Sequence, residues 1–295
     1  MSSIVVRPAR PEDKPRIVEI SGQIWEGNDY VPSVLEEWMQ APGSLLAVAT
    51  WDDLVIGFGH GEWITPETYW LEGLRTDPAW WNHGAGKAIF RFFLEWAQGQ
   101  KALQIRLSTY VENFASIHLI ESHGFQRAAR FIYLESEKPY PRDDSTEKPS
   151  LAALEEAAAF IQDSSFQDQA RGFFPHGWKF SLFAQNPRTI LAAEKYLLAV
   201  RRNHRLAALL AASYPHGQSN QMSVDFLEGT SEEAIFLLSY LIRLEAAVQY
   251  WETMVPCSGE QPLATIDAFQ QVGFQCWHEG TPDVFVYEKD LKGVT

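Results

Sequence analysis

Residues 70–89 read WLEGLRTDPAWWNHGAGKAI. An apolar run over Tyr69–Thr76 predicts a β-strand, and the segment from Gly84 to Gln98 has apolar residues at helical spacing. Between them lies a loop whose glycines allow close approach of the backbone to an anion. A helix N-terminus offers free N–H groups and a positive dipole end, both of which favour a pyrophosphate. Lys87 adds a positive charge there, so the stretch predicts a phosphate-binding strand, loop and helix.

The spacing of this loop excludes two common phosphate-binding motifs. A P-loop requires glycine five residues before Gly86 and serine or threonine after Lys87, but Trp81 and Ala88 stand there. A dinucleotide-binding fingerprint requires glycine or alanine three residues after Gly86, where Ile89 stands. A dinucleotide-dependent oxidoreductase is therefore not expected.

Flanking segments complete a pattern of alternating strands and helices. Apolar runs over 44–51 and 54–63 flank Asp52-Asp53 and predict a hairpin. Further strands are predicted over 4–9, 103–109 and 126–135. Residues 113–125 read NFASIHLIESHGF and predict a helix that ends at Gly124.

These segments, in this order, resemble the GNAT superfamily of acyl-CoA-dependent N-acetyltransferases over about residues 3–137. The resemblance lies in Val6–Ala9, Leu74–Pro78, the Gly84-Ala85-Gly86 loop and the Asn, Leu and Gly-Phe positions of residues 113–125. It implies an α/β fold with a mixed, mostly antiparallel central sheet and helices on both faces. It also implies direct transfer of an acetyl group from acetyl-CoA to a primary amine.

The resemblance further implies a set of coenzyme-binding residues. Backbone N–H groups near Leu74–Thr76 would polarise the thioester carbonyl, as in an oxyanion site. For Asn113 a helix cap, for Ser116 an ordinary helical serine and for His83 a solvated loop residue remain open as alternatives. The implied coenzyme-binding residues are Leu74, Arg75, Thr76, Asn82, His83, Gly84, Ala85, Gly86, Lys87, Asn113 and Ser116.

Acetyl transfer to an amine also requires a base. Glu72 shares a strand face with Leu74 by period-two alternation and is the first candidate. Its structural alternative is an ion pair with Arg75 or Arg106. Glu62, on the preceding strand, is the second candidate base, with a solvated strand end as its alternative.

Two positions depart from the family pattern. Trp81 replaces the Arg or Gln of the phosphate loop, and Ile120 replaces the Tyr that lies near the coenzyme sulfur in many members. An isoleucine cannot donate a proton to a leaving thiolate. A non-catalytic acyl-CoA-binding or sensing module therefore stays open as the alternative function.

A proline-rich, charged stretch, SEKPYPRDDSTEKPS at residues 136–150, predicts a linker. We expect an N-terminal coenzyme-binding domain over residues 1–137, a linker over 138–150 and a C-terminal domain over 151–295. The second half repeats the order of hairpin, strand, long helix, strand, helix, Gly-Phe and strand, which suggests a whole-domain duplication.

The second half lacks the phosphate loop. At the equivalent place, residues 226–234 read FLEGTSEEA, with one glycine and no lysine. Ser231 is expected to cap the following helix, and Glu232 and Glu233 would repel a pyrophosphate. We therefore expect a degenerate GNAT-like domain with a structural role.

Composition and charge restrict the partners, cofactors and cellular setting that we expect for this protein. The 295-residue chain is 46% hydrophobic and 21% charged, with a net charge of −14, so neither nucleic acid nor an anionic membrane surface is an expected partner. No apolar stretch resembles a signal peptide or membrane span. Cys257 and Cys276 fit neither a disulfide scaffold nor a zinc motif, so no metal is expected and a cytoplasmic setting follows. The expected partner is a small-molecule or peptide amine, and a homodimer remains open.

Overall fold

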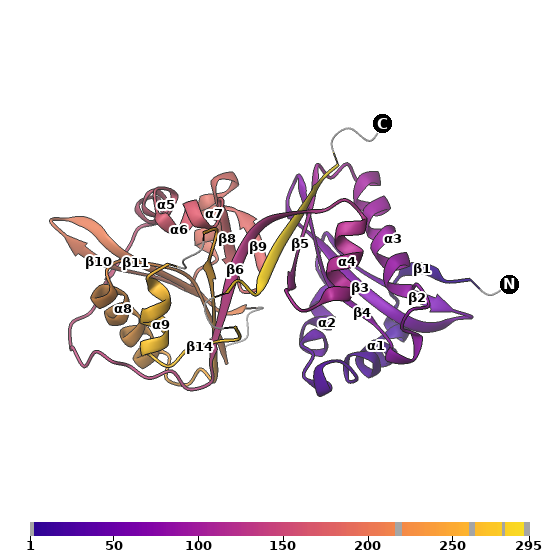
Figure 1. Cartoon of the computed structure of the whole chain (residues 1–295), viewed down its shortest axis with the longest axis horizontal. Helices are drawn as coiled ribbons and strands as arrows, with labels where there is room; N and C mark the ends of the chain where they lie inside the picture. The colour runs from indigo at the N-terminus through magenta and orange to yellow at the C-terminus, as the bar shows by residue number, and fades with distance from the viewer. Residues whose placement is uncertain (1–2, 216–219, 260–262, 279–280, 292–295) are drawn as a thin grey trace. The chain divides into compact units, whose positions relative to one another are not determined.

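The computed structural model describes residues 3–215, 220–259, 263–278 and 281–291. The chain divides into two compact units, which are described separately (Figure 1). The first comprises Met1–Leu107, His118–Gln126 and Glu288–Thr295, and the second comprises Ser108–Ile117 and Arg127–Tyr287. Residues 138–150, predicted as a linker, lie wholly in the second unit.

The chain up to residue 122 follows the predicted alternation, with the additional helix α2 that sequence reasoning missed. Its elements are β1 (Val5–Pro8), η1 (Pro11–Asp13), α1 (Lys14–Ser21), η2 (Trp25–Gly27), α2 (Val31–Gln40), β2 (Ser44–Trp51), β3 (Leu54–Thr65), β4 (Thr68–Thr76), η3 (Pro78–Trp80), α3 (Ala85–Gly99), β5 (Gln104–Tyr110) and α4 (Phe114–Ser122).

The sheet of the first unit has the order β1-β2-β3-β4-β5, followed by the end of β15 (Val284–Asp290). Strands β1 to β4 pair antiparallel, and β4 pairs with β5 in parallel. Gln104 and Arg106 of β5 contact Asp290 and Glu288, at 2.9 and 3.3 Å. This unit therefore contains a strand end from the far end of the sequence.

Helices cover both faces of this sheet. A Cβ atom on Gly57 or Gly59 of β3 would meet Ile89 of α3, at 3.3 and 3.0 Å. Phe58, which lies between the two glycines, is buried in the opposite cluster with residues of α1 and α2. Because alternate residues of a strand face opposite sides, α3 covers one face and α1 and α2 the other.

The remaining chain contains the predicted second series, together with α6, β7, β8 and β14, which were not expected. Its elements are β6 (Gln126–Ser136), β7 (Ser150–Leu151), α5 (Leu154–Gln162), α6 (Ser165–Gln169), β8 (Phe173–His176), β9 (Lys179–Leu182), η4 (Phe183–Gln185), α7 (Pro187–Ala192), β10 (Tyr196–Arg202), β11 (Arg205–Ser213), β12 (Gln221–Glu228), α8 (Ser231–Leu244), β13 (Tyr250–Pro256), α9 (Thr265–Gln271), β14 (Gln275–Cys276) and β15.

The sheet of the second unit has the order β15-β6-β13-β12-β11-β10-β7, and β8 and β9 form a separate hairpin. Strands β10, β11 and β12 pair antiparallel, and β12 pairs with β13 in parallel. These are the pairing senses of β2, β3, β4 and β5 in the first unit. Here too one strand is exchanged, since β6, which ends the first half of the sequence, pairs with β13.

Helices cover both faces of the second sheet as well. Leu227 of β12 joins the core formed with α8 and α9, whereas the neighbouring Phe226 packs against Phe160 and Phe166 of α5 and α6. The prediction of mixed, mostly antiparallel sheets with helices on both faces is therefore confirmed. Within the described residues, no helix is both long and apolar enough to cross a membrane.

Candidate active site

The candidate site lies at the end of β4, beyond the residues that pair with β5. Parallel pairing between β4 and β5 covers only Thr68–Trp70, opposite Gln104–Arg106. In the described part of the chain, β4 has no recorded ladder on that edge beyond Trp70. Its pairing with β3 is also irregular, because the register shifts between Phe58 and His60. The far end of β4 is thus a bulged strand with one open edge, a common setting for binding sites.

Gly73 lies within this bulge. Its φ is +65°, and a Cβ atom there would lie 2.5 Å from the ring of Trp38 in α2. That indole stacks on the imidazole of His60, with ring centroids 4.2 Å apart and an interplanar angle of 4°. The bulge therefore lets the backbone approach α2 and packs the tryptophan against a buried histidine.

His60 lies between the expected base, Glu72, and Ser44 and contacts both. Its Nδ1 lies 3.0 Å from Glu72 Oε1, and its Nε2 lies 2.6 Å from Ser44 Oγ. The Ser44 hydroxyl also contacts the carbonyl of Trp38 at 2.7 Å. Since that carbonyl can only accept and a hydroxyl has one proton, Ser44 accepts from His60 Nε2–H when all three bonds form.

His60 and Glu72 then share one proton. Either the imidazole is doubly protonated beside a carboxylate, or Glu72 carries the proton and donates it to Nδ1. In the first form Glu72 is a carboxylate with its orientation fixed. The His60 side chain is fully buried and that of Glu72 is 12% exposed, so the carboxylate lies at the edge of the buried network.

Glu62 joins the same cluster. Ligand atoms of His60, Glu62 and Glu72 all lie within 4.8 Å of one another, so both candidate bases fall in one place. The expected ion-pair partners of Glu72 are engaged elsewhere. Arg75 forms a bidentate pair with Asp29, at 2.9 and 3.1 Å.

The guanidinium of Arg75 also lies over the ring of Trp25, 4.4 Å from its centroid. Its side chain is therefore held by the protein, and its backbone remains the part available for a coenzyme. Arg106, the other expected partner of Glu72, is fully buried and pairs with Glu288.

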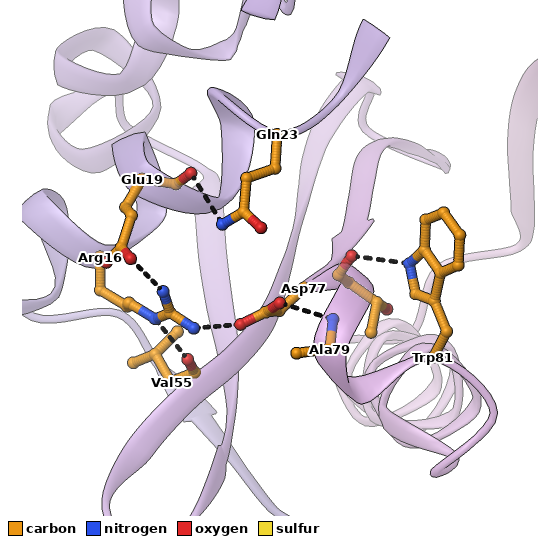
Figure 2. A network of polar contacts seen from close by, with 8 residues as sticks. Arg16, Glu19, Gln23, Val55, Asp77, Ala79 and Trp81 are labelled. Atoms are coloured by element: carbon orange, nitrogen blue, oxygen red, sulfur yellow. Dashed lines mark hydrogen bonds and ion pairs between the residues drawn. The ribbon is translucent and has the colours of Figure 1, made fainter. Parts of the chain in front are cut away.

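Asp77 anchors the end of β4 (Figure 2). Its carboxylate pairs with Arg16 of α1 and accepts the N–H of Ala79 at 2.8 Å, which caps η3. Arg16 also donates to the Val55 carbonyl at 3.1 Å. Trp81 Nε1 donates to the carbonyl of Thr76 at 3.1 Å. These contacts hold the start of the phosphate loop against the strand end.

The loop itself leaves the N-terminus of α3 open. Asn82 and Gly84 adopt positive φ values of 64° and 89°, and Gly84, the N-cap residue, supplies no side-chain cap. Ala88 N–H makes the first helical bond, to the Gly84 carbonyl at 3.0 Å. The N–H groups of Ala85, Gly86 and Lys87 thus precede the helical ladder, and no acceptor for them is recorded in the described residues.

Space is available at this terminus. A Cβ atom on Gly84 would meet nothing within 4 Å, and one on Gly86 would lie 3.6 Å from Thr76 Oγ1 and 4.0 Å from Leu74. The side chains of His83 and Lys87 are exposed, and His83 Nδ1 contacts the Trp81 carbonyl at 2.9 Å. The end of β4 and the start of α3 therefore lie together around an exposed, uncapped helix end, as a pyrophosphate requires.

Asn113 and Ser116, the last two residues predicted to bind the coenzyme, lie in the second unit. Asn113 Oδ1 accepts the N–H of Ser116 at 3.3 Å, which is the helix-cap role held open for Asn113. Ile120, which belongs to the first unit, is only 4% exposed. It packs as a core residue, and its side chain has no proton to donate.

In the second unit, the N-terminus of the equivalent helix, α8, is capped by side chains. Thr230, not the expected Ser231, is the N-cap of α8, and it forms a capping box with Glu233. Glu233 Oε2 accepts from the backbone N–H of Thr230 at 2.9 Å, and its Oε1 pairs with Arg202 at 2.9 Å. Two donors are thus satisfied within the chain and a carboxylate occupies the first turn, which disfavours phosphate there.

Sequence reasoning missed His60 and Ser44. His60 lies two residues before Glu62 on β3, so period-two alternation already placed both on one strand face. Ser44 lies opposite Glu62 in the β2–β3 register. The signal for His60 was available in the sequence, whereas that for Ser44 depended on the register.

Comparison with known protein families gives a match over the first part of the chain. Residues 14–125 match the model of the acetyltransferase (GNAT) family. The sequence matches none of the curated proteins with which it was compared.

Solved structures of similar fold cover nearly the whole chain. A GCN5-related N-acetyltransferase from Sphaerobacter thermophilus has a TM-score of 0.64 at 11% identity, over 97% of this chain and 95% of that one. A protein from Thermoplasma acidophilum, named as an acetyltransferase, has a TM-score of 0.63 at 15% identity, over 97% and 99%. A GCN5-related glucosamine N-acetyltransferase region of a fungal β-N-acetylglucosaminidase has a TM-score of 0.61 at 14% identity, over 98% of this chain and 38% of that one. At such low identity these likenesses show the fold alone.

Proposed function

Because residues 14–125 form a GNAT acetyltransferase domain, we propose that this protein transfers an acetyl group from acetyl-CoA to a primary amine. GNAT acetyltransferases use acetyl-CoA, whose thioester supplies the activated acyl group. The observation that carries the proposal is the uncapped N-terminus of α3 beside the open edge of β4. The acceptor is a small-molecule or peptide amine.

The residues around α3 fit the coenzyme. The N–H groups of Ala85, Gly86 and Lys87 would bind the pyrophosphate, with His83 and the Lys87 ammonium beside them. The exposed loop residue Asn82 holds the turn that presents them. On the open edge of β4, backbone N–H groups near Leu74–Thr76 would bind the thioester oxygen.

Glu72 accepts the proton of the acceptor amine in this proposal. His60 fixes its Oε1 at 3.0 Å, and Ser44 and Trp38 fix the imidazole in turn. A base held in one orientation loses less entropy on reaching the reactive geometry. Glu62 remains the alternative base, since it lies in the same cluster.

We further propose that residues 151–295 are a degenerate GNAT-like domain that binds no coenzyme. The repeated strand pairing supports the duplication, and the capping box at α8 supports the loss of coenzyme. Both cysteines are free, which suits a reducing, cytoplasmic setting.

The test combines coenzyme binding with thiol release. Calorimetry should give one acetyl-CoA per chain. CoA release is then measured with a panel of amines, including amino sugars, polyamines and peptides. Glu72→Gln should lower kcat by roughly 10²–10⁴-fold, the range typical of general-base loss, and leave acetyl-CoA affinity within about threefold. Glu62→Gln is the matched control and should lower kcat less than about tenfold.

Buried Ile120 at the usual tyrosine position favours a second function, a non-catalytic acyl-CoA-binding or sensing module. That function predicts one acetyl-CoA per chain but no amine-dependent CoA release and no effect of Glu72→Gln on release. The absence of acetyl-CoA binding would refute both functions.

A further inference from the structure

We propose that the second unit contains a binding site for a divalent transition-metal ion, formed by His176, Glu194 and Asp225. His176 is the last residue of β8, Glu194 follows α7, and Asp225 lies in β12. Their ligand atoms all lie within 4.8 Å of one another. The site is separate from the proposed acetyl-transfer site, and its test requires no activity measurement.

The distances match a tetrahedral ion. Zinc binds imidazole nitrogen and carboxylate oxygen at about 2.0–2.2 Å, so two ligand atoms of a tetrahedral site lie about 3.3 Å apart. His176 Nδ1 lies 3.2 Å from Glu194 Oε1 and 3.8 Å from Asp225 Oδ2. Imidazole nitrogen and carboxylate oxygen are both zinc ligands, and three protein ligands leave a fourth position for water.

Glu194 supplies the independent observation. Its side chain is fully buried and forms an ion pair with His176 at 3.2 Å, but neither carboxylate oxygen has a contact of hydrogen-bond geometry in the described structure. Its charged neighbour is His176, whose Nδ1 it shares with Asp225. A buried carboxylate without hydrogen bonds is costly, and a cation between the three side chains would satisfy it.

Asp225, by contrast, is already oriented as a metal ligand usually is. Its Oδ2 accepts from Ser213 Oγ at 2.5 Å, and its Oδ1 accepts from Ser223 Oγ at 2.5 Å and from the N–H of Gly177 at 3.2 Å. Such outer contacts fix the direction of ligating carboxylates. The chain therefore orients Asp225 by hydrogen bonds, whereas Glu194 has its ion pair with His176 and no hydrogen bond in the described structure.

The local charge also requires compensation. A third buried carboxylate, Glu252, lies close enough to Gly177 that a Cβ atom there would be 2.8 Å from its Oε1. Three carboxylates and one imidazolium leave two negative charges in the interior, an unfavourable state. A divalent cation would displace the Nδ1 proton of His176 and leave one negative charge in place of two.

In the His60 cluster of the first unit, by contrast, neither Glu62 nor Glu72 has a buried carboxylate oxygen without a hydrogen-bond partner. Both imidazole nitrogens of His60 already have partners, Glu72 and Ser44. Glu62 of that cluster therefore supplies the matched control for the experiment.

The experiment is a metal titration of the full chain. The protein is freed of metal with a chelator, and Zn²⁺ binding is measured by calorimetry; bound Co²⁺ is followed by its visible absorption. Wild type should bind one Zn²⁺ tightly, and Zn²⁺ should raise its melting temperature. Glu194→Gln should weaken binding at least 100-fold, since loss of outer contacts alone costs about 10–100-fold. Glu62→Gln should keep wild-type affinity.

A second variant keeps all three ligands. Ser223→Ala removes one contact that orients Asp225 and should weaken Zn²⁺ binding about tenfold; it decides the matter if Glu194→Gln does not fold by circular dichroism. The proposal is overturned if wild type binds no Zn²⁺, or if the folded variants bind it as tightly as wild type does. In that case His176 is an imidazolium shared by two carboxylates.

Discussion

Gly73→Ala should destabilise the first unit by an amount that the geometry of the bulge allows us to estimate. Gly73 has a φ of +65°, and its new Cβ atom would lie 2.5 and 2.9 Å from two ring atoms of Trp38. A left-handed non-glycine residue costs about 1–2 kcal/mol, and overpacking a core costs about 1–3 kcal/mol. Trp38 is 3% exposed and stacks on His60, so it has little room to move. We expect a loss of about 2–5 kcal/mol.

Gly84→Ala is the matched control. Its φ of +89° imposes a similar backbone cost, but its Cβ atom would meet nothing within 4 Å. The free energy of unfolding of both variants is measured by urea denaturation, followed by far-UV circular dichroism. Gly73→Ala should cost about 1–3 kcal/mol more than Gly84→Ala, which is the steric part.

A double variant tests the assignment to Trp38. Adding Trp38→Leu to Gly73→Ala should recover most of the steric part, because the leucine removes the ring atoms that clash. Equal costs for Gly73→Ala and Gly84→Ala, or full additivity with Trp38→Leu, would refute the reasoning.

Three further changes have signs fixed by the structure. Burial raises the pKa of Asp283 from 3.8 to about 6. The folded state therefore binds the Asp283 proton more tightly than the unfolded state does, and the free energy of unfolding falls as the pH rises from about 4 to 6. In melting curves recorded over this pH range, Asp283→Asn should flatten the fall and stabilise the protein above pH 6 by up to about 3 kcal/mol. Thr230→Ala removes the cap of α8 and should cost about 1 kcal/mol in urea unfolding, whereas Ser231→Ala should cost less than about 0.5 kcal/mol. Arg16→Met leaves the carboxylate of Asp77, whose side chain is 5% exposed, without its cation and should cost about 3 kcal/mol, most of which the addition of Asp77→Asn should restore in the same measurement.

Individual strands and helices could be predicted because each depends on the spacing of apolar residues within one short segment. The hairpin around Asp52-Asp53 and the strand, loop and helix over 69–98 follow from period-two and helical spacing with glycine at the turn, and the structure has them within a residue or two. Helix α2 was missed although its apolar residues repeat at helical spacing. The N-cap of α8 was placed one residue late because serine is the better N-cap by residue type, whereas the contact of Glu233 with the Thr230 N–H places the cap at Thr230.

The contacts around the candidate base could not be predicted in the same way. Glu72 and His60 are twelve residues apart and meet through the β3–β4 register, which depends on a bulge that shifts every later pair. The pairing of Arg75 with Asp29 spans 46 residues and depends on how the chain before α2 folds back. Sequence spacing carries no information on either contact. The cluster of His176, Glu194 and Asp225 is of the same kind, since it joins three separate elements without a ligand motif.

The exchanged strands also constrain the order in which the protein can be made. Arg106 is fully buried, and its acidic partner Glu288 lies 182 residues later in the chain. During synthesis on the ribosome, the first sheet therefore lacks the strand that pairs beside β5 until nearly all of the chain has emerged. Until then, β5 exposes unpaired backbone groups, and an open strand edge is prone to pairing with other chains. We expect a fragment that ends at the proline-rich stretch to keep this open edge, and its solubility to improve when residues 288–291 are supplied as well.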